Sequence, residues 1–329
     1  MLNRRVLMKA AGSLPLAWSA ATPWSALAQG PAYPSKPVTL VVPFGPGNAA
    51  DTIGRLIALH LGNALSQQVI VENRPGAGGV SAVKQVAAAK PDGHTLLYIG
   101  AGVAISQGLF KPQPYDMLAS FAPISIASSN DVLLLVRKDS PLTQLEDFIR
   151  AAQEKKDRCM VGVSLLGTTQ HLSAELFKQR AKVDFTIVPF KTAAAVATAL
   201  SAGDIDLGFE FVPPMLSLVK SGQLRALAIA NAKRSDVLPD VPTIAEQGLA
   251  GFNVASWGMI VAPKHTPEAV VQRLNQEVQR ALLHPDVARR LADIGVRAPG
   301  GTTAQAQELL SSEIVRWRNV IHASNISLR

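Results

Sequence analysis

Apolar runs alternate with amphipathic stretches along most of the chain. The run at 38–43, V-T-L-V-V-P, is typical of a buried strand, and Ile53, Leu56, Ile57 and Leu61 recur at the spacing of one helical face. A second strand, an alanine-rich helix, a P-D-G turn and a third strand follow. These strands are predicted at 38–43, 69–72 and 95–99, and the helices at 51–65 and from 80 to 89.

A second series of the same kind occupies the middle of the chain. Strands that alternate with helices predict an α/β architecture, in which right-handed crossovers build parallel sheets. Because no flexible linker divides the two series, we expect the chain to cross between two lobes more than once. The strands are predicted at 132–137, 160–163, 185–189, 205–209, 226–230 and 258–262, and the helices at 143–155, 169–180, 192–202, 213–221, 267–294 and 304–323.

Composition narrows the class of protein. Of 329 residues, 48% are hydrophobic and 17% are charged, which favours a folded chain over a disordered or coiled-coil one, and the length suggests two domains. A single cysteine excludes an intramolecular disulfide, a cysteine zinc site and an iron–sulfur cluster. The net charge of +8 comes without a block of lysine and arginine, so the sequence gives no support for nucleic-acid binding.

The first 28 residues have the pattern of a secretory signal. Arg4, Arg5 and Lys9 precede an apolar, alanine-rich stretch that ends in A-L-A at Ala28. The run N-R-R-V-L-M-K is similar to a twin-arginine export signal. We expect cleavage after Ala28 and a periplasmic protein, with a net charge of +8 − 3 = +5. Prolines interrupt this segment, and no other segment reaches the roughly 18 consecutive apolar residues of a membrane span.

The loop at 44–51 resembles a nucleotide-binding loop. Gly45, Gly47 and Ala50 match G-x-G-x-x-A, and Glu72 ends the next strand, as in the dinucleotide fingerprint. Against this, a proline removes one backbone N–H group from the loop, and an acidic residue opens the helix where a phosphate would lie. An exported oxidoreductase that uses NAD(P) or FAD is therefore kept as the alternative function.

Three strand-to-helix loops have a similar physical character. In the first, Asn48 and Asp51 are spaced as an N-cap and its partner in a variant of the capping box. The others, at 164–170 and 190–193, end strands with small or hydroxyl residues, and each leaves free N–H groups at a helix start, where anions bind. Ligands of open α/β sheets bind beyond the carboxyl ends of the strands. We therefore expect the three loops to hold an anion between two lobes, with Glu210 lining the same cleft.

Motifs for catalysis are absent from the sequence. It contains no G-x-S-x-G, no G-x-x-x-x-G-K-[ST] and no H-E-x-x-H, and no two of the six histidines are four residues apart. His171, beside Thr168 and Thr169, is more typical of a capping or packing residue than of a catalytic base, and Cys159 is expected to be buried at the start of a strand. We assign no catalytic residue, no metal site and no cofactor.

Seven further motifs follow one another along the chain, together with Trp257 and the A-P pair at 262–263. The motifs are V-P-F at 42–44, V-E-N-R-P-G-A-G-G at 71–79, P-D-G-H-T-L-L at 91–97, G-T-T-Q-H-L at 167–172, P-F-K at 189–191, L-R-A-L-A at 224–228 and L-P-D-V-P-T at 238–243. In these motifs the chain resembles, from about Tyr33 to its C-terminus, the tripartite tricarboxylate transporter receptors, the Bug-type extracytoplasmic solute receptors. The number of motifs makes the resemblance specific.

The resemblance implies a two-lobed periplasmic binding protein of the type II-like Venus-flytrap kind, with a mostly parallel sheet in each lobe. The first lobe is then discontinuous, 29–131 plus 254–329, and the second spans 132–253. The implied function is capture of a small organic acid, without catalysis, by a monomer that delivers it to the permease subunits of a tripartite tricarboxylate-type transporter. A sensor subunit with the same fold and ligand is the remaining alternative.

The resemblance also implies the binding residues. One ligand carboxylate is typically held by the first loop, partly through ordered waters, and the hydroxyls of Ser164, Thr168 and Thr169 are expected to meet carboxylate oxygens. Asn48 stands where the family usually has the second glycine of P-G-G-x-x-D, and Phe190 and Thr192 replace the tyrosine and glycine of P-Y-K-G, so we expect an altered ligand preference. The full expected set is Phe44, Gly47, Asn48, Ala50, Asp51, Gly100, Ala101, Ser164, Gly167, Thr168, Thr169, Phe190, Lys191, Thr192, Ala193 and Glu210.

Overall fold

The computed structural model describes residues 33–76 and 79–326. The predicted signal segment, 1–28, and its cleavage site lie outside the described residues. Within the described ranges, none of the helices combines the length and the apolar character needed to cross a membrane.

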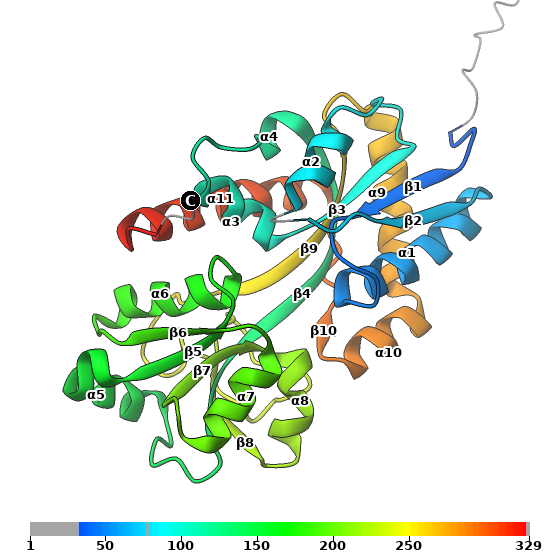
Figure 1. Ribbon diagram of the computed structural model, residues 1–329. Helices are drawn as coiled ribbons and strands as arrows, with labels where there is room; N and C mark the ends of the chain where they lie inside the picture. Colours follow the sequence, from blue (N-terminus) through cyan, green and yellow to red (C-terminus); the bar gives the residue numbers. More distant parts are fainter. Residues whose placement is uncertain (1–32, 77–78, 327–329) are drawn as a thin grey trace, which may run out of the picture. The chain divides into compact units, whose positions relative to one another are not determined.

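The described strands form one ten-stranded sheet with helices packed on its faces (Figure 1). Neighbouring strands follow the order β2-β1-β3-β9-β4-β7-β5-β6, and β8 and β10 pair with β4. The strands are β1 (Val38–Val42), β2 (Val69–Asn73), β3 (Thr95–Gly100), β4 (Phe121–Arg137), β5 (Met160–Ser164), β6 (Thr186–Phe190), β7 (Leu207–Phe211), β8 (Leu224–Ile229), β9 (Ala255–Pro263) and β10 (Val296–Arg297). The helices are α1 (Ala49–Leu65), α2 (Val80–Ala87), α3 (Ala101–Leu109), α4 (Met117–Ser120), α5 (Leu145–Lys155), α6 (Thr169–Ala181), α7 (Ala193–Ala202), α8 (Val212–Lys220), α9 (Glu268–Leu283), α10 (Pro285–Asp293) and α11 (Thr303–Ala323), with a 3-10 turn at Lys156–Arg158.

The first three strands confirm the predicted parallel arrangement. β1 lies between β2 and β3, and Leu40 is in register with Val71 and Leu96. Successive residues of a strand face opposite sides of the sheet. Leu40 and Val42 therefore pack on the side covered by α1, α9 and α10, and Val41 packs on the side covered by α2, α3 and α11.

β4 belongs to both halves of the sheet. Its first part pairs antiparallel with β9, as far as Asp131 opposite Ala255, and from Val132 onward it pairs antiparallel with β7 and β8. Figure 1 shows β4 and β9 running side by side between the two groups of helices. The sequence predicted only the second part of this strand, at 132–137.

The sheet is mixed rather than mostly parallel. Parallel pairing holds within β2-β1-β3 and within β6-β5-β7. β9 is antiparallel to β3 and β4, and β4 is antiparallel to β7, β8 and β10. The long antiparallel strands β4 and β9 thus join two parallel units.

The helix predicted at 267–294 is interrupted and forms α9 and α10. Pro285 occupies the first position of α10, where its missing N–H group costs no hydrogen bond, and the preceding His284 has an extended backbone with ψ of 130°. A proline inside one continuous helix would remove a backbone bond and clash with the preceding turn. The sequence prediction of a single helix was wrong because it followed the apolar periodicity across this proline.

The C-terminal helix α11 packs into the cores of both halves. Ala306, Leu310 and Ile314 pack in the cluster formed with β1, β3, α2 and α3. Trp317 and Ile321 pack in the cluster formed with β4, β5, α5 and α6. This helix therefore contributes apolar burial on both sides of the point where β4 changes partners.

Trp317→Ala is expected to lower the free energy of unfolding by about 3–5 kcal/mol, because it empties a fully buried site. Urea unfolding measures the change. Val315→Ala, on the same helix at a side chain that is 54% exposed, should change stability by less than about 0.5 kcal/mol. Equal effects of the two substitutions would contradict the role of α11 in both cores.

Candidate functional site

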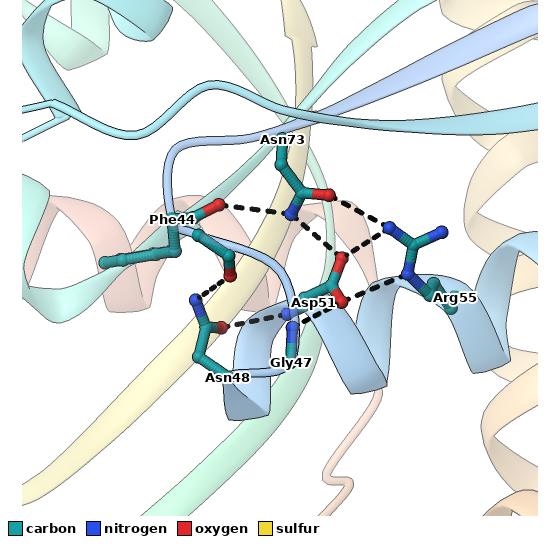
Figure 2. Close-up of polar contacts among 7 residues, drawn as sticks. Phe44, Gly47, Asn48, Asp51, Arg55 and Asn73 are labelled. Carbon is teal, nitrogen blue, oxygen red and sulfur yellow. Dashed lines mark hydrogen bonds and ion pairs between the residues drawn. The ribbon is translucent and has the colours of Figure 1, made fainter.

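The loop after β1 is folded on itself by side-chain hydrogen bonds (Figure 2). Asn48 is the N-cap of α1: its Oδ1 accepts from the N–H of Asp51 at 3.0 Å, and its Nδ2 donates to the carbonyl of Gly45 at 2.6 Å. The Asp51 carboxylate accepts from the N–H of Gly47 at 2.9 Å, so it reaches one residue beyond the N-cap. The predicted capping role of Asn48 and Asp51 is confirmed, in this variant form.

A network of hydrogen bonds around one buried carboxylate fixes the back of this loop. The Asp51 carboxylate is buried and accepts from Arg55 Nε at 3.0 Å and from Asn73 Nδ2 at 2.8 Å. Asn73 also donates to the carbonyl of Phe44 at 3.1 Å, which ties β2 to the loop. Burial alone would raise the pKa of Asp51, but the hydrogen bonds from Arg55, Gly47 and Asn73 outweigh it and lower that pKa to about 2.

Two members of this network were not predicted as site residues. Arg55 is four residues after Asp51, the spacing of an acid–base pair on one helical face, and that spacing was available in the sequence. Asn73 lies in the V-E-N-R-P motif, but only the pairing of β1 with β2 brings it to the loop. The network therefore depends partly on tertiary structure.

A cavity of about 500 Å³ lies where the loops after β1, β3 and β5 meet. One wall is the start of α3, whose N-cap, Gly100, has no side chain to cap the first N–H groups of the helix. Ala101 and Gly102 follow it in the wall, so a ligand can approach the backbone closely. Seven of the predicted binding residues line this cavity: Phe44, Gly100, Ala101, Ser164, Gly167, Thr168 and Thr169.

The hydroxyls on the opposite wall are partly engaged by the protein. Thr168 Oγ1 donates to the carbonyl oxygens of Ser164 at 2.9 Å and Leu165 at 3.0 Å. The Ser164 hydroxyl is hydrogen-bonded to the Glu210 carboxyl. The hydrogen-bond donors of Thr168 and Ser164 are thus engaged, whereas the Thr169 hydroxyl has no protein partner among the hydrogen bonds of the described residues.

Glu210 lies behind the cavity wall. It is fully buried, and Gln170 Nε2 donates to its Oε2 at 3.3 Å. Burial raises the pKa of Glu210, although the hydrogen bonds from Ser164 and Gln170 oppose that shift. Glu210 therefore orients two residues of the wall and does not itself line the cavity.

A smaller cavity of about 240 Å³ adjoins the first on the side of α1. Phe44, Gly100 and Ser256 line both cavities, so the Phe44 side chain lies at their common border. Asn48 and Ala50 line only the smaller cavity. The Asn48 amide retains one N–H donor beyond its bond to the loop, which a ligand or water can use.

The remaining predicted residues lie outside both cavities. Phe190 packs against Gly162, where an added Cβ would be 3.2 Å from the Phe190 ring, and Thr192 caps α7 by accepting from the N–H of Ala195 at 3.2 Å. These roles direct the loop after β6 toward its own helix and core. The residues outside the two cavities are Gly47, Asp51, Phe190, Lys191, Thr192, Ala193 and Glu210.

Several lining residues were not predicted from the sequence. Leu165 and Leu166 lie in the loop at 164–170 but are not in the predicted site, and Ser256 comes from β9, which no motif connected to these loops. In the part of the chain that the structure describes, the lining of both cavities contains no lysine, arginine, aspartate or glutamate. Among the residues that the structure describes, no group of three or more histidine, cysteine or acidic side chains is arranged to hold a metal ion.

Comparison with known sequences gives the family. Residues 53–326 match the family described as tripartite tricarboxylate transporter family receptor. A UPF0065 protein in the tcbD-tcbE intergenic region of Pseudomonas sp. (strain P51) is 36% identical over 291 residues, which cover 88% of this chain and 87% of that protein. The family match spans most of the chain, including the loops that form the larger cavity after β3 and β5.

Two similar solved structures agree with this result. MatC (Rpa3494) from Rhodopseudomonas palustris with bound malate has 36% sequence identity and a TM-score of 0.72, and the match covers 88% of this chain and 100% of that one. R. palustris Rpa4515 with adipate has 35% identity and a TM-score of 0.75, with 90% and 99% covered. Because the matched family consists of receptors, the oxidoreductase alternative is set aside. The chain belongs to the tripartite tricarboxylate transporter receptor family and is a solute-binding receptor with the two-lobed α/β fold of periplasmic binding proteins.

Proposed function

We propose that this receptor is exported to the periplasm, binds a small organic acid as a monomer in the 500 Å³ cavity, and delivers it to the permease subunits of a tripartite tricarboxylate-type transporter. The observation that carries the proposal is the uncapped start of α3 in the wall of that cavity. Family membership and the malate and adipate bound by two similar receptors support the ligand class. The signal-like segment at 1–28 supports export.

The ligand carboxylate is held by backbone N–H groups. The first N–H groups of α3 have no side-chain cap, and the positive end of the helix dipole favours an anion there. Hydrogen bonds from N–H groups to a carboxylate are charge-assisted and are stronger than those to a neutral acceptor. Thr169, at the start of α6, supplies a hydroxyl from the opposite wall.

The two lobes are 29–131 plus 254–329, and 132–253. The change of strand partners supports this division, because β4 leaves β9 after Asp131 and joins β7 and β8 from Val132. The segment that leads back to the first lobe changes its partners at the same level. The N–H of Val254 donates to the carbonyl of Ala230 in the second lobe, and the next residue, Ala255, begins the pairing with Asp131 in the first. Lobe closure about these two crossings would bring the α3 and α6 walls together on the ligand.

The network behind the first loop preorganises it for binding. Asp51, Arg55 and Asn73 hold the loop in one geometry before ligand arrives, which reduces the ordering cost of association. The same network makes the Asp51 charge internal to the protein, so it does not repel an anion at α3. The loop therefore acts as a fixed wall.

A thermal-shift screen of the chain from Gln29 onward, with mono-, di- and tricarboxylates, amino acids and dinucleotides, tests the proposed function. An acid present at 100 times its Kd should add about 2.7 kcal/mol of stability, which gives a shift of several degrees. A panel in which dinucleotides stabilise the protein and acids do not would contradict the proposal.

Gly102→Asp is expected to weaken the tightest-binding acid of that panel at least tenfold, because it places a negative charge at the start of α3. No atom lies within 4 Å of the position that its Cβ would occupy, so the substitution fits without strain. Gly102→Asn is the matched control, with the same shape and no charge. Titration calorimetry showing equal affinities for the two variants would refute the carboxylate position.

Asp51→Asn is expected to lose about 1–2 kcal/mol of stability at pH 7, because the lowered pKa of Asp51 means that its charged form is favoured in the folded state. This contribution is present above the ordinary pKa of 3.8 and is lost as the pH falls toward about 2. Urea unfolding at pH 7 and pH 3 should therefore show that the difference in free energy of unfolding between the unsubstituted protein and Asp51→Asn becomes smaller at the lower pH. Asp139→Asn, at an exposed side chain, serves as the control. A stability difference between the unsubstituted protein and Asp51→Asn that does not change with pH would contradict the role of the Asp51 network.

A further inference from the structure

Exposed apolar side chains gather in the proposed binding cavity. Phe44, Leu165 and Leu166 are 40%, 53% and 48% exposed, and all three line it. They are three of the eight large apolar side chains that the described residues leave exposed. Such side chains are normally scattered singly on a soluble protein, whereas a gathered set marks a binding surface.

Leu165 holds its place at a conformational cost. Its φ is +57°, in the left-handed region, where a leucine is disfavoured and a glycine is not. Its N–H donates to the carbonyl of Phe190 at 2.9 Å, and its own carbonyl accepts from Thr168 at 3.0 Å, so the surrounding loops maintain this backbone. Strain of this kind is concentrated at functional sites. Because this backbone conformation favours glycine, the presence of leucine indicates that its side chain has a role in the site.

The rest of the lining favours one charge over two. Val103, Leu109, Phe110 and Phe211 extend the apolar surface, and among the described residues no cationic side chain lines either cavity. One carboxylate is accommodated by the N–H groups of α3. The polar side chains elsewhere in the lining are neutral, and the donors of Ser164, Thr168 and Gln170 are already hydrogen-bonded within the protein, so a second carboxylate would meet few free donors and no cation. Burying an unpaired charge is strongly unfavourable.

We propose that the ligand is a monocarboxylate with an apolar aliphatic or aromatic body, and that Phe44, Leu165 and Leu166 set this specificity by closing on that body. The inference rests on the proposed function and narrows its ligand class. Phe44 approaches from the loop after β1, and the two leucines come from the loop after β5, so lobe closure would bury the body between them. A cavity of roughly 150 Å³ suffices for benzene, so the 500 Å³ cavity has room for a substituted ring and its carboxylate.

Titration calorimetry with matched probes tests the ligand class. Hexanoate and adipate share a six-carbon chain and differ in the second carboxylate, and benzoate and benzamide differ in charge. We expect hexanoate and benzoate to bind at least tenfold more tightly than adipate, malate and citrate. Tighter binding of any of these polyacids would overturn the inference and leave the proposed function intact. Failure of every acid, or benzamide binding as tightly as benzoate, would instead refute the proposed function and the inference with it.

The double substitution Leu165→Gly and Leu166→Ala tests the specificity residues. Glycine suits the left-handed backbone at 165, so the thermal unfolding temperature should be unchanged or raised. Affinity for hexanoate should fall about tenfold relative to affinity for malate, since only the apolar contact is removed. Leu283→Ala, at a side chain that is 80% exposed and outside the cavity, should leave both affinities unchanged. An unchanged hexanoate-to-malate ratio in the double variant would overturn the assignment.

Discussion

The pairing of β4 constrains every other part of the site. The first part of β4 pairs with β9 and its second part pairs with β7 and β8, and the pairing partner changes between Asp131 and Val132. Arg297 donates to the Asp131 carboxylate at 2.5 Å and Asn231 donates to it at 2.6 Å, so residues from both sides of the crossing meet at the change of partners. Through this shared strand, the loops after β1 and β3 and the loop after β5 line one cavity.

The charges around that cavity are arranged so that none of them faces it. Asp51 forms an ion pair with Arg55 and accepts a hydrogen bond from Asn73 behind the first loop, and Glu210 is buried behind the second with a raised pKa. In the proposed site, the polar attraction for a ligand comes from backbone N–H groups at the start of α3, which are fixed by the fold and need no partner cation. We propose that such a site accepts one anionic group and that its apolar side chains select the rest of the ligand.

Local patterns were sufficient to predict much of the fold. The spacing of Ile53, Ile57 and Leu61 gave α1, and the apolar runs gave the parallel strands, because burial on one or both faces leaves a direct pattern in the sequence. The first part of β4 was missed since serines interrupt its apolar pattern, and α3 was missed because Gly100 gives no N-cap signal. The antiparallel pairing of β9 with both β3 and β4 joins segments that are far apart in the sequence, so no local pattern predicts it.

The binding site was predicted less completely for the same reason. Loop composition identified Thr168 and Thr169 as cavity residues, and Gly100 was predicted with the family resemblance, but Ser256 enters only through the pairing of β9 with its neighbours. Leucine in a loop carries no polar signal, so Leu165 and Leu166 were recognised only from their exposure and position.

A crystal structure with bound hexanoate would show where the carboxylate and the hydrocarbon chain lie. We predict carboxylate oxygens about 3 Å from the backbone nitrogens at the start of α3, with the hydrocarbon chain against Phe44, Leu165 and Leu166. A carboxylate bound instead at Lys191, with the chain in solvent, would contradict this prediction.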